Sequence, residues 1–271
     1  MTSSWNDPRS ATGDDVAGRR NGKNGKTVRS RWRFQIIRAG RRFIRRRWVD
    51  DRLDALRFML DTAPTVEYQP LPWLGKAGER AEGTYSRWTE IRRAIEGTPV
   101  TSALDIGANI GFFSISLGLR GVEVVALERE PRYQRILRLA TGRLGLENVS
   151  ILELSLAPCR VRLLPRADLV LFLSVWHHVV REHGLKAAEK MLGEVWERCE
   201  SVMIFDTGQD EMPEHYGLPN MEPNAREWVE NLLSRHCEGG RVEYLGEHAA
   251  FDPAGRPCTR SLFAVRRQTG S

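Results

Sequence analysis

Residues 104–113 read LDIGANIGFF, and this stretch decides the fold. The apolar run VTSALDIG, residues 100–107, ends here with the acidic residue Asp105 and a turn at Gly107. A helical pattern begins two residues later, at Asn109. In an α/β sheet, a ligand binds past the carboxyl end of the first strand. There, glycines let the backbone approach it and the next helix presents free N–H groups. Gly107 and Gly111 therefore predict a ligand-binding turn.

Strands and helices alternate around this turn. Apolar runs with the length and composition of strands occupy 100–107, 122–128, 148–154, 168–175, 201–206, 241–247 and 260–267. Helical patterns occupy 86–95, 109–121, 131–145, 184–199 and 222–237. Strands that alternate with helices predict an α/β, Rossmann-like, doubly wound sheet whose strands are mostly parallel and whose two faces are covered by helices.

The net charge of +6 is concentrated before this domain. Residues 1–50 contain 14 Lys and Arg against 4 Asp and Glu, a net of +10, whereas the remaining 221 residues have a net of −4. Residues 1–27 are polar and are predicted to be a disordered tail, and residues 28–63 interleave arginines with apolar residues at helical spacing. We therefore expect a basic amphipathic helical arm over 28–63, a proline-containing connecting segment over 64–83, and the folded domain over 84–271.

Composition also excludes several classes of protein. No stretch approaches the roughly 20 consecutive apolar residues that span a bilayer, and the basic N-terminal segment lacks the apolar region of a secretory signal. The four cysteines contain no C-x-x-C pair, so neither a zinc site nor a disulfide framework is indicated. The sequence predicts a cytoplasmic protein with no metal site. Peripheral attachment at the inner membrane face through the arm is an alternative.

The glycine turn departs from the dinucleotide-binding pattern G-x-G-x-x-G at Asn109. Instead, LDIGANIGFF resembles the first motif of the class I S-adenosylmethionine-dependent methyltransferases, and the resemblance covers about residues 84–268. It implies a seven-stranded sheet whose last strand is antiparallel, with S-adenosyl-L-methionine as the cofactor. It also implies that Glu128, which ends the second strand, binds the cofactor ribose. The residues implied for the cofactor turn are Asp105, Gly107, Ala108, Asn109 and Gly111.

The end of the fourth strand, DLVLFLSVWHHVV at 168–180, is where this family lines its reaction pocket. Ser174 is predicted to contact the cofactor there. Because an imidazole with a pKa near 6.5 can take a proton near neutral pH, His177 or His178 is predicted as the catalytic base. A packing role is the alternative for both histidines. Arg87, ahead of the first strand, is predicted to bind the cofactor carboxylate as a bidentate donor.

The segment between the third and fourth strands differs from the family pattern. The stretch 155–167 contains two prolines and lacks the acidic residue that often binds adenine, so a short or missing third helix and a more open adenine pocket are expected. The acidic stretch 206–215 follows the fifth strand. It is predicted to lie on the same rim, either as a loop that binds a cationic or hydroxyl-rich substrate or a metal, or as a solvated surface loop, and no ligand spacing in it singles out a metal.

The resemblance implies methyl transfer to an oxygen or nitrogen of a small-molecule, saccharide or lipid-linked substrate. Two alternatives stay open: an RNA (tRNA) methyltransferase that uses the basic arm, and a non-catalytic module that keeps the fold for binding. Residues 28–60 would suit RNA or an anionic membrane surface, because aromatic side chains alternate with arginines there. No specific protein partner is implied.

Overall fold

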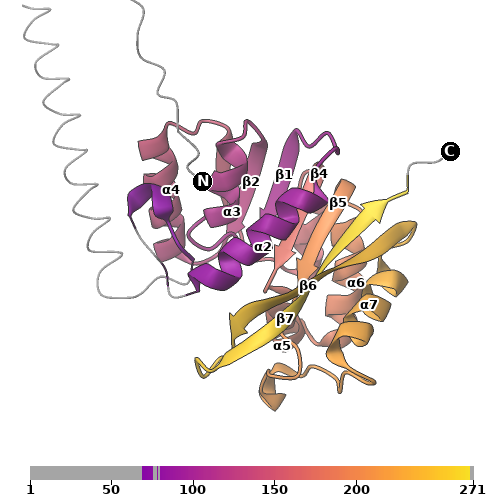
Figure 1. Cartoon of the computed structure of the whole chain (residues 1–271). Helices are drawn as coiled ribbons and strands as arrows, with labels where there is room; N and C mark the ends of the chain where they lie inside the picture. The colour runs from indigo at the N-terminus through magenta and orange to yellow at the C-terminus, as the bar shows by residue number, and fades with distance from the viewer. Residues whose placement is uncertain (1–68, 76–77, 79, 269–271) are drawn as a thin grey trace, which may run out of the picture. The chain divides into compact units, whose positions relative to one another are not determined.

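The computed structural model describes residues 69–75, 78 and 80–268, and these contain one seven-stranded sheet (Figure 1). The strands are β1 (Ser102–Ile106), β2 (Glu123–Glu128), β3 (Val149–Glu153), β4 (Ala167–Leu173), β5 (Cys199–Asp206), β6 (Gly240–Phe251) and β7 (Pro257–Arg267). They lie in the order β3-β2-β1-β4-β5-β7-β6. The first five pair in parallel, and β7 is antiparallel to both of its neighbours. The predicted fold class is therefore confirmed.

Helices cover both faces of this sheet. The α-helices are α2 (Ala81–Ala94), α3 (Phe112–Gly118), α4 (Pro131–Leu144), α5 (Trp176–His183), α6 (Leu185–Trp196) and α7 (Ala225–His236). Alternate side chains of β4 point to opposite faces: Val170 and Phe172 pack with α5, α6 and α7, whereas Leu169 and Leu171 pack with α2 and α3. Burial on both faces explains why the central strands read as continuous apolar runs. None of the described helices is long and apolar enough to cross a membrane.

The segment between β3 and β4 contains a short 3₁₀ helix, η2 (Pro158–Leu163), in place of a full third helix. Pro158 lies at its start and Pro165 follows its end, and a proline inside a helix removes a hydrogen bond and clashes with the preceding turn. The prediction of a shortened helix is confirmed.

The β6–β7 hairpin is longer than the sequence predicted. β5 pairs with β7 only through Phe263–Arg266, whereas β6 and β7 continue to pair with each other out to Phe251 and Pro257. We call the part beyond β5, residues 247–251 and 257–261, the flap. It extends past the rest of the sheet in Figure 1.

Helix α2 lies directly against the flap. A Cβ added at Gly83 would come within 1.9 Å of the Ala249 carbonyl oxygen, so a larger residue does not fit at this crossing. One turn later, the Ser86 hydroxyl lies 2.9 Å from Nδ1 of His248. The helix begins at Ala81, several residues before the predicted helical pattern, and its first turn is the part that meets the flap.

The arm and tail predicted over residues 1–63 lie outside the described residues, as do residues 64–68, 76–77 and 79 of the connecting segment. The predicted domain boundaries therefore remain predictions.

Candidate functional site

A cavity of about 560 Å³ opens at the carboxyl ends of the parallel strands. Its wall combines the turn after β1, the ends of β2 and β4, the first turns of α5, and the flap. Eight of the ten residues predicted from the sequence line it: Arg87, Asp105, Gly107, Asn109, Glu128, Ser174, His177 and His178. Residues separated by up to 91 positions in the chain therefore meet in one site, at the place where open α/β sheets bind ligands.

The other two predicted residues, Ala108 and Gly111, shape the turn from behind. The Ala108 N–H donates to the Leu127 carbonyl at 2.8 Å, which ties the turn to β2. Gly111 has φ +92°, and a Cβ there would lie 2.0 Å from Cδ1 of Leu137 on α4. The structure therefore gives Ala108 and Gly111 packing contacts rather than cavity contacts.

The turn itself brings the backbone to the cavity. Gly107 has φ +75°, and a Cβ at this position would meet Cγ2 of Val175 at 2.4 Å. Asn109 also has a left-handed backbone, with φ +55°, and its buried side-chain Oδ1 has no hydrogen-bond partner among the described residues. A buried acceptor without a donor is costly, so this atom is suited to a donor from a ligand.

Glu128 ends β2 with its carboxylate held in place. Its Oε2 accepts from the Asn109 N–H at 2.7 Å, and its Oε1 accepts from the Glu130 N–H at 2.7 Å. The residue is only 7% exposed. Each carboxylate oxygen has about two acceptor sites, so one on each remains for a ligand with paired hydroxyl groups.

Asp105 is buried beneath the turn. The Ser114 hydroxyl of α3 donates to its Oδ2 at 2.6 Å. Burial raises the pKa of Asp105 to about 6, because a charged carboxylate is poorly solvated there, although the Ser114 hydrogen bond opposes the shift. Asp105 therefore links the turn to α3 and also lines the cavity.

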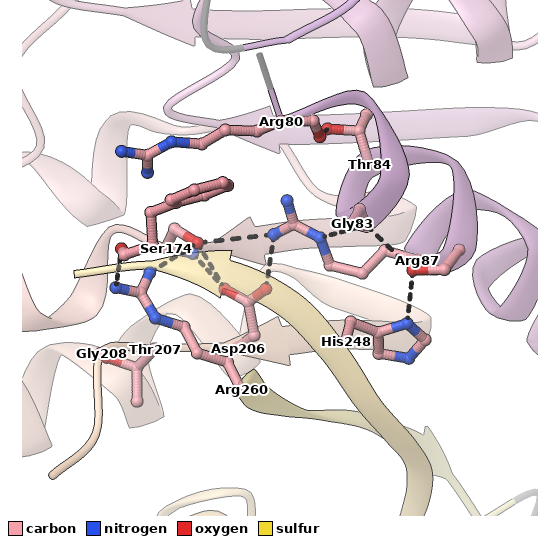
Figure 2. Close-up of polar contacts among 12 residues, drawn as sticks. Arg80, Gly83, Thr84, Arg87, Ser174, Asp206, Thr207, Gly208, His248 and Arg260 are labelled. Atoms are coloured by element: carbon pink, nitrogen blue, oxygen red, sulfur yellow. Dashed lines mark hydrogen bonds and ion pairs between the residues drawn. The ribbon is translucent and has the colours of Figure 1, made fainter. Parts of the chain in front are cut away.

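A buried ion pair closes the wall between α2 and β5. Nη1 of Arg87 lies 2.7 Å from Oδ2 of Asp206, and the Arg87 Nε donates to the Gly83 carbonyl at 3.0 Å (Figure 2). The backbone N–H and hydroxyl of Ser174 both donate to Oδ1 of Asp206. Arg87 is 7% exposed and Asp206 is 1% exposed, so removing either residue would leave the charge of the other buried without its ion-pair partner.

A second pair, which the sequence did not predict, lies beside the first. Arg260 of the flap places its Nε 2.7 Å from Oε1 of Glu211, and its Nη1 donates to the Ser174 hydroxyl at 3.4 Å. Arg87 and Arg260 thus reach Ser174 from different elements (Figure 2). Asp206 and Glu211, predicted as members of one acidic rim, are instead engaged in these pairs.

The two histidines stand at the start of α5 with different partners. Nδ1 of His177 accepts from the Gly208 N–H at 2.8 Å, so the neutral ring carries its proton on Nε2. Burial lowers the pKa of His177 well below its ordinary value, and the charges of His178 and Arg260 lower it further. Burial and the charges of Arg181 and Arg129 lower the pKa of His178 to about 4. Both rings are therefore neutral at pH 7.

The described residues contain no group of three or more His, Cys, Asp or Glu side chains that could hold a metal ion. The chemistry available here is that of carboxylates, guanidinium groups and two neutral imidazoles around a glycine turn.

No family model matches the chain. Among curated proteins it is similar to the O-antigen chain terminator bifunctional methyltransferase/kinase WbdD of Escherichia coli, with 26% identity over 209 residues. That match covers 71% of this chain and 26% of WbdD, so the chain spans about a quarter of the length of its curated relative.

Solved structures show the same fold. A 2.2 Å crystal structure of WbdD matches with a TM-score of 0.56 at 22% identity, covering 77% of this chain and 46% of that one. Magnesium protoporphyrin IX methyltransferase (ChlM) from Synechocystis PCC 6803, solved with bound SAM, matches with a TM-score of 0.50 at 15% identity. This match covers 69% of this chain and 79% of ChlM.

Proposed function

We propose that the chain is a class I S-adenosylmethionine-dependent methyltransferase and that it transfers a methyl group to a hydroxyl oxygen of a saccharide. The observation that carries the proposal is Glu128: a buried strand-end carboxylate, fixed by two backbone N–H groups, beside a glycine turn in a cavity of about 560 Å³. The saccharide is supported by the sequence match to a methyltransferase that terminates O-antigen chains.

The residues present fit S-adenosylmethionine. The free acceptor sites of Glu128 suit the two ribose hydroxyls, and the unpartnered Oδ1 of Asn109 suits a donor such as the cofactor ammonium. Arg87 lines the cavity near the turn and suits the cofactor carboxylate. Leu154, Ser155 and Leu156 line the side reached from β3, where they offer mostly apolar surface for a base.

The bound cofactor would supply an electrophilic methyl group, and the chain's own residues would orient the acceptor and handle its proton. His177 is held in one tautomer by the Gly208 amide, so its Nε2–H is a hydrogen-bond donor. His178 lines the same cavity and is neutral, so an unprotonated ring nitrogen can accept the hydroxyl proton. We therefore assign the base to His178 and an orienting role to His177.

The test is transfer of a labelled methyl group to separated saccharide, RNA, lipid and small-molecule fractions of the host extract. We expect the saccharide fraction to take the label. His178→Gln should lower turnover by about 10² to 10⁴ without changing cofactor affinity, because it removes the base and leaves the turn intact. His183→Gln, at the exposed end of the same helix, is the matched control. Labelling of RNA instead, or wild-type turnover in His178→Gln, would contradict the proposal.

The basic segment 28–60 lies outside the described residues, and its binding to RNA or to an anionic membrane remains a prediction, as does the cytoplasmic location. A variant that lacks residues 1–60 should still bind cofactor and should lose salt-sensitive retention on anionic vesicles, because charge attraction is screened by salt. Salt-sensitive retention of the intact chain on RNA, without retention on vesicles, would favour the RNA alternative.

A further inference from the structure

Tyr216 is a buried residue in an otherwise exposed turn. It ends the short 3₁₀ helix η3 (Glu214–Tyr216) in the loop after β5. The neighbouring residues 213–215 and 217 are exposed, whereas Tyr216 is only 6% exposed. Its side chain lines the cavity, and η3 contacts α5. The tyrosine is therefore the residue through which this turn joins the wall of the site.

The Tyr216 ring contacts both histidines. Its centroid lies 5.8 Å from that of His177 and 5.8 Å from that of His178, and the two imidazole centroids are 4.3 Å apart. Rings packed at such distances attract one another and restrict each other's rotation. The three side chains therefore form one cluster at the start of α5.

The two histidines differ in what orients them. The Gly208 N–H donates to Nδ1 of His177, which fixes that ring. Nδ1 of His178 is buried, and it has no hydrogen-bond partner among the described residues. A catalytic imidazole is commonly oriented by a hydrogen bond at its second nitrogen. In His178 that bond is absent from the described part of the chain, so packing has to hold the ring.

Arg181 of α5 holds Tyr216 in turn. Its guanidinium lies 4.9 Å from the centroid of the Tyr216 ring, and its Nη1 donates to the Tyr216 hydroxyl at 3.3 Å. Because Arg181 follows His178 by three residues on the same helix, both lie on one side of α5. The tyrosine thereby fixes a positive charge close to the imidazole.

Resting on the proposed function, we infer that Tyr216 is a positioning residue for proton transfer, which holds the His178 ring in one orientation toward the cavity and keeps Arg181 beside it. An acceptor hydroxyl then meets an imidazole whose orientation is already set, which lowers the entropy cost of the reaction. A tyrosine that only anchored the loop would affect stability and leave the behaviour of His178 unchanged.

The same cluster influences the charge of His178. Burial lowers the pKa of His178 to about 4, and Arg181 is the charge that contributes most. Loss of the Tyr216 ring would admit water to the imidazole and release Arg181, and both changes would raise this pKa toward its ordinary value near 6.5. The other charged or titratable groups that face the cluster are common to the variant and the wild type: His177, Glu182, Arg129, Arg260 and His215.

The first test is an NMR titration of the His178 ring in the full chain, with the signal assigned by its loss in His178→Gln. We expect a pKa of about 4 in the wild type, a similar value in Tyr216→Phe, which keeps the ring, and a value raised toward 6.5 in Tyr216→Leu. Tyr244→Leu is the matched control. Arg226 lies 4.0 Å from the centroid of the Tyr244 ring, but Tyr244 does not line the cavity, so this variant should titrate as the wild type does.

The second test compares kcat at pH 5.5 and pH 8, using the saccharide fraction that takes the label. With a pKa near 6.5, only about one His178 ring in ten is neutral at pH 5.5, so Tyr216→Leu should lose about tenfold between the two pH values. The wild type, Tyr216→Phe and Tyr244→Leu should lose much less. S-adenosylhomocysteine affinity at pH 8 should be equal in all four proteins, because the glycine turn is untouched.

An unchanged His178 pKa in Tyr216→Leu, or the same shift in Tyr244→Leu, would overturn the inference. Should Tyr216→Leu fail to fold, Arg181→Gln decides, because its side chain is 33% exposed and its loss removes the charge that Tyr216 holds. The His178 pKa should rise in that variant, and an unchanged value would again overturn the inference. Absence of methyl transfer to the saccharide fraction by the wild type would instead overturn the proposed function, and the titration would still report on Tyr216.

Discussion

Glu128→Gln is the substitution that tests the cofactor site most directly. The glutamine has nearly the size of the glutamate, but it lacks the charge and one acceptor oxygen. Glu128 now accepts two backbone N–H groups at 2.7 Å, one on each oxygen. In the variant, the amide NH₂ group must face one of these donors, so one turn N–H loses its partner.

The expected loss has two parts. A buried N–H without a partner costs about 1 to 3 kcal/mol of folding free energy. Hydrogen bonds from the ribose hydroxyls would also weaken, since those to a charged group contribute about 1.5 to 3 kcal/mol and neutral ones about 0.5 to 1.5. The difference of about 1 to 3 kcal/mol corresponds to a roughly 5- to 150-fold weaker Kd for S-adenosylmethionine.

Calorimetry with S-adenosylmethionine measures the affinity, and thermal unfolding measures the stability separately. Glu153→Gln is the matched control, because Glu153 stands opposite Glu128 in the β2–β3 register, yet its side chain is exposed and paired with Arg138. We expect the control to bind as the wild type does. An unchanged Kd in Glu128→Gln would refute the assignment of the cofactor to this carboxylate.

Three further predictions concern stability. Arg87→Met should lower the free energy of unfolding by about 3 to 5 kcal/mol in urea titrations, because it leaves a buried carboxylate unpaired; a loss below 1 kcal/mol would contradict this. Gly83→Ala should destabilise the chain by about 1 to 3 kcal/mol or more, since its Cβ would meet a β6 carbonyl, whereas Gly142→Ala on α4 meets nothing and should be neutral or stabilising. His178 has a pKa of about 4 when folded and near 6.5 when unfolded, so only the unfolded chain binds the proton between these values. Wild-type stability should therefore fall relative to His178→Gln as the pH drops from about 6.5 to 4, and parallel unfolding curves for the two proteins would rule this out.

The central sheet was predictable because its strands are buried on both faces. Each of β1, β2, β4 and β5 is a short apolar run, and such a run indicates a buried strand. The glycine turn and the strand-end carboxylate 23 residues after Asp105 then indicated the class I methyltransferase fold, which is confirmed. The antiparallel last strand followed from that resemblance and is confirmed by the pairing of β7 with β5 and β6, and the cofactor is part of the proposed function.

The flap and α5 were not predictable in the same way. Flap residues 247–251 pair only with the opposite strand of the hairpin, so they lack the apolar run of a buried strand. Helix α5 is eight residues long and follows β4 after a sharp turn at Ser174, which has φ +55°. Its apolar residues continue the apolar run of β4, so the sequence pattern does not show where the strand ends and the helix begins. Tertiary pairing determines both elements.

The buried ion pairs of the site also depend on tertiary contacts that the sequence pattern does not show. Arg260 and Glu211 are 49 residues apart and meet only because the flap folds over the loop after β5. A charged residue at the edge of an apolar strand carries no local signal of its partner. The sequence therefore predicted the glycine turn, whose parts are close together in the chain, and missed the pairing of Arg260 with Glu211 at the flap.

The position of β7 between β5 and β6 has a consequence for the order of folding. The strands up to β5 are joined by local crossovers, and β6 with β7 forms a local hairpin, but β5 can pair with β7 only after the chain has been synthesised past residue 266. Until then the edge of β5 is open on the nascent chain, where unpaired strand edges favour aggregation. Arg260 enters the cavity in the same docking step, so the flap side of the cavity forms last. A variant that weakens hairpin docking would lose this wall of the cavity before it loses the glycine turn after β1.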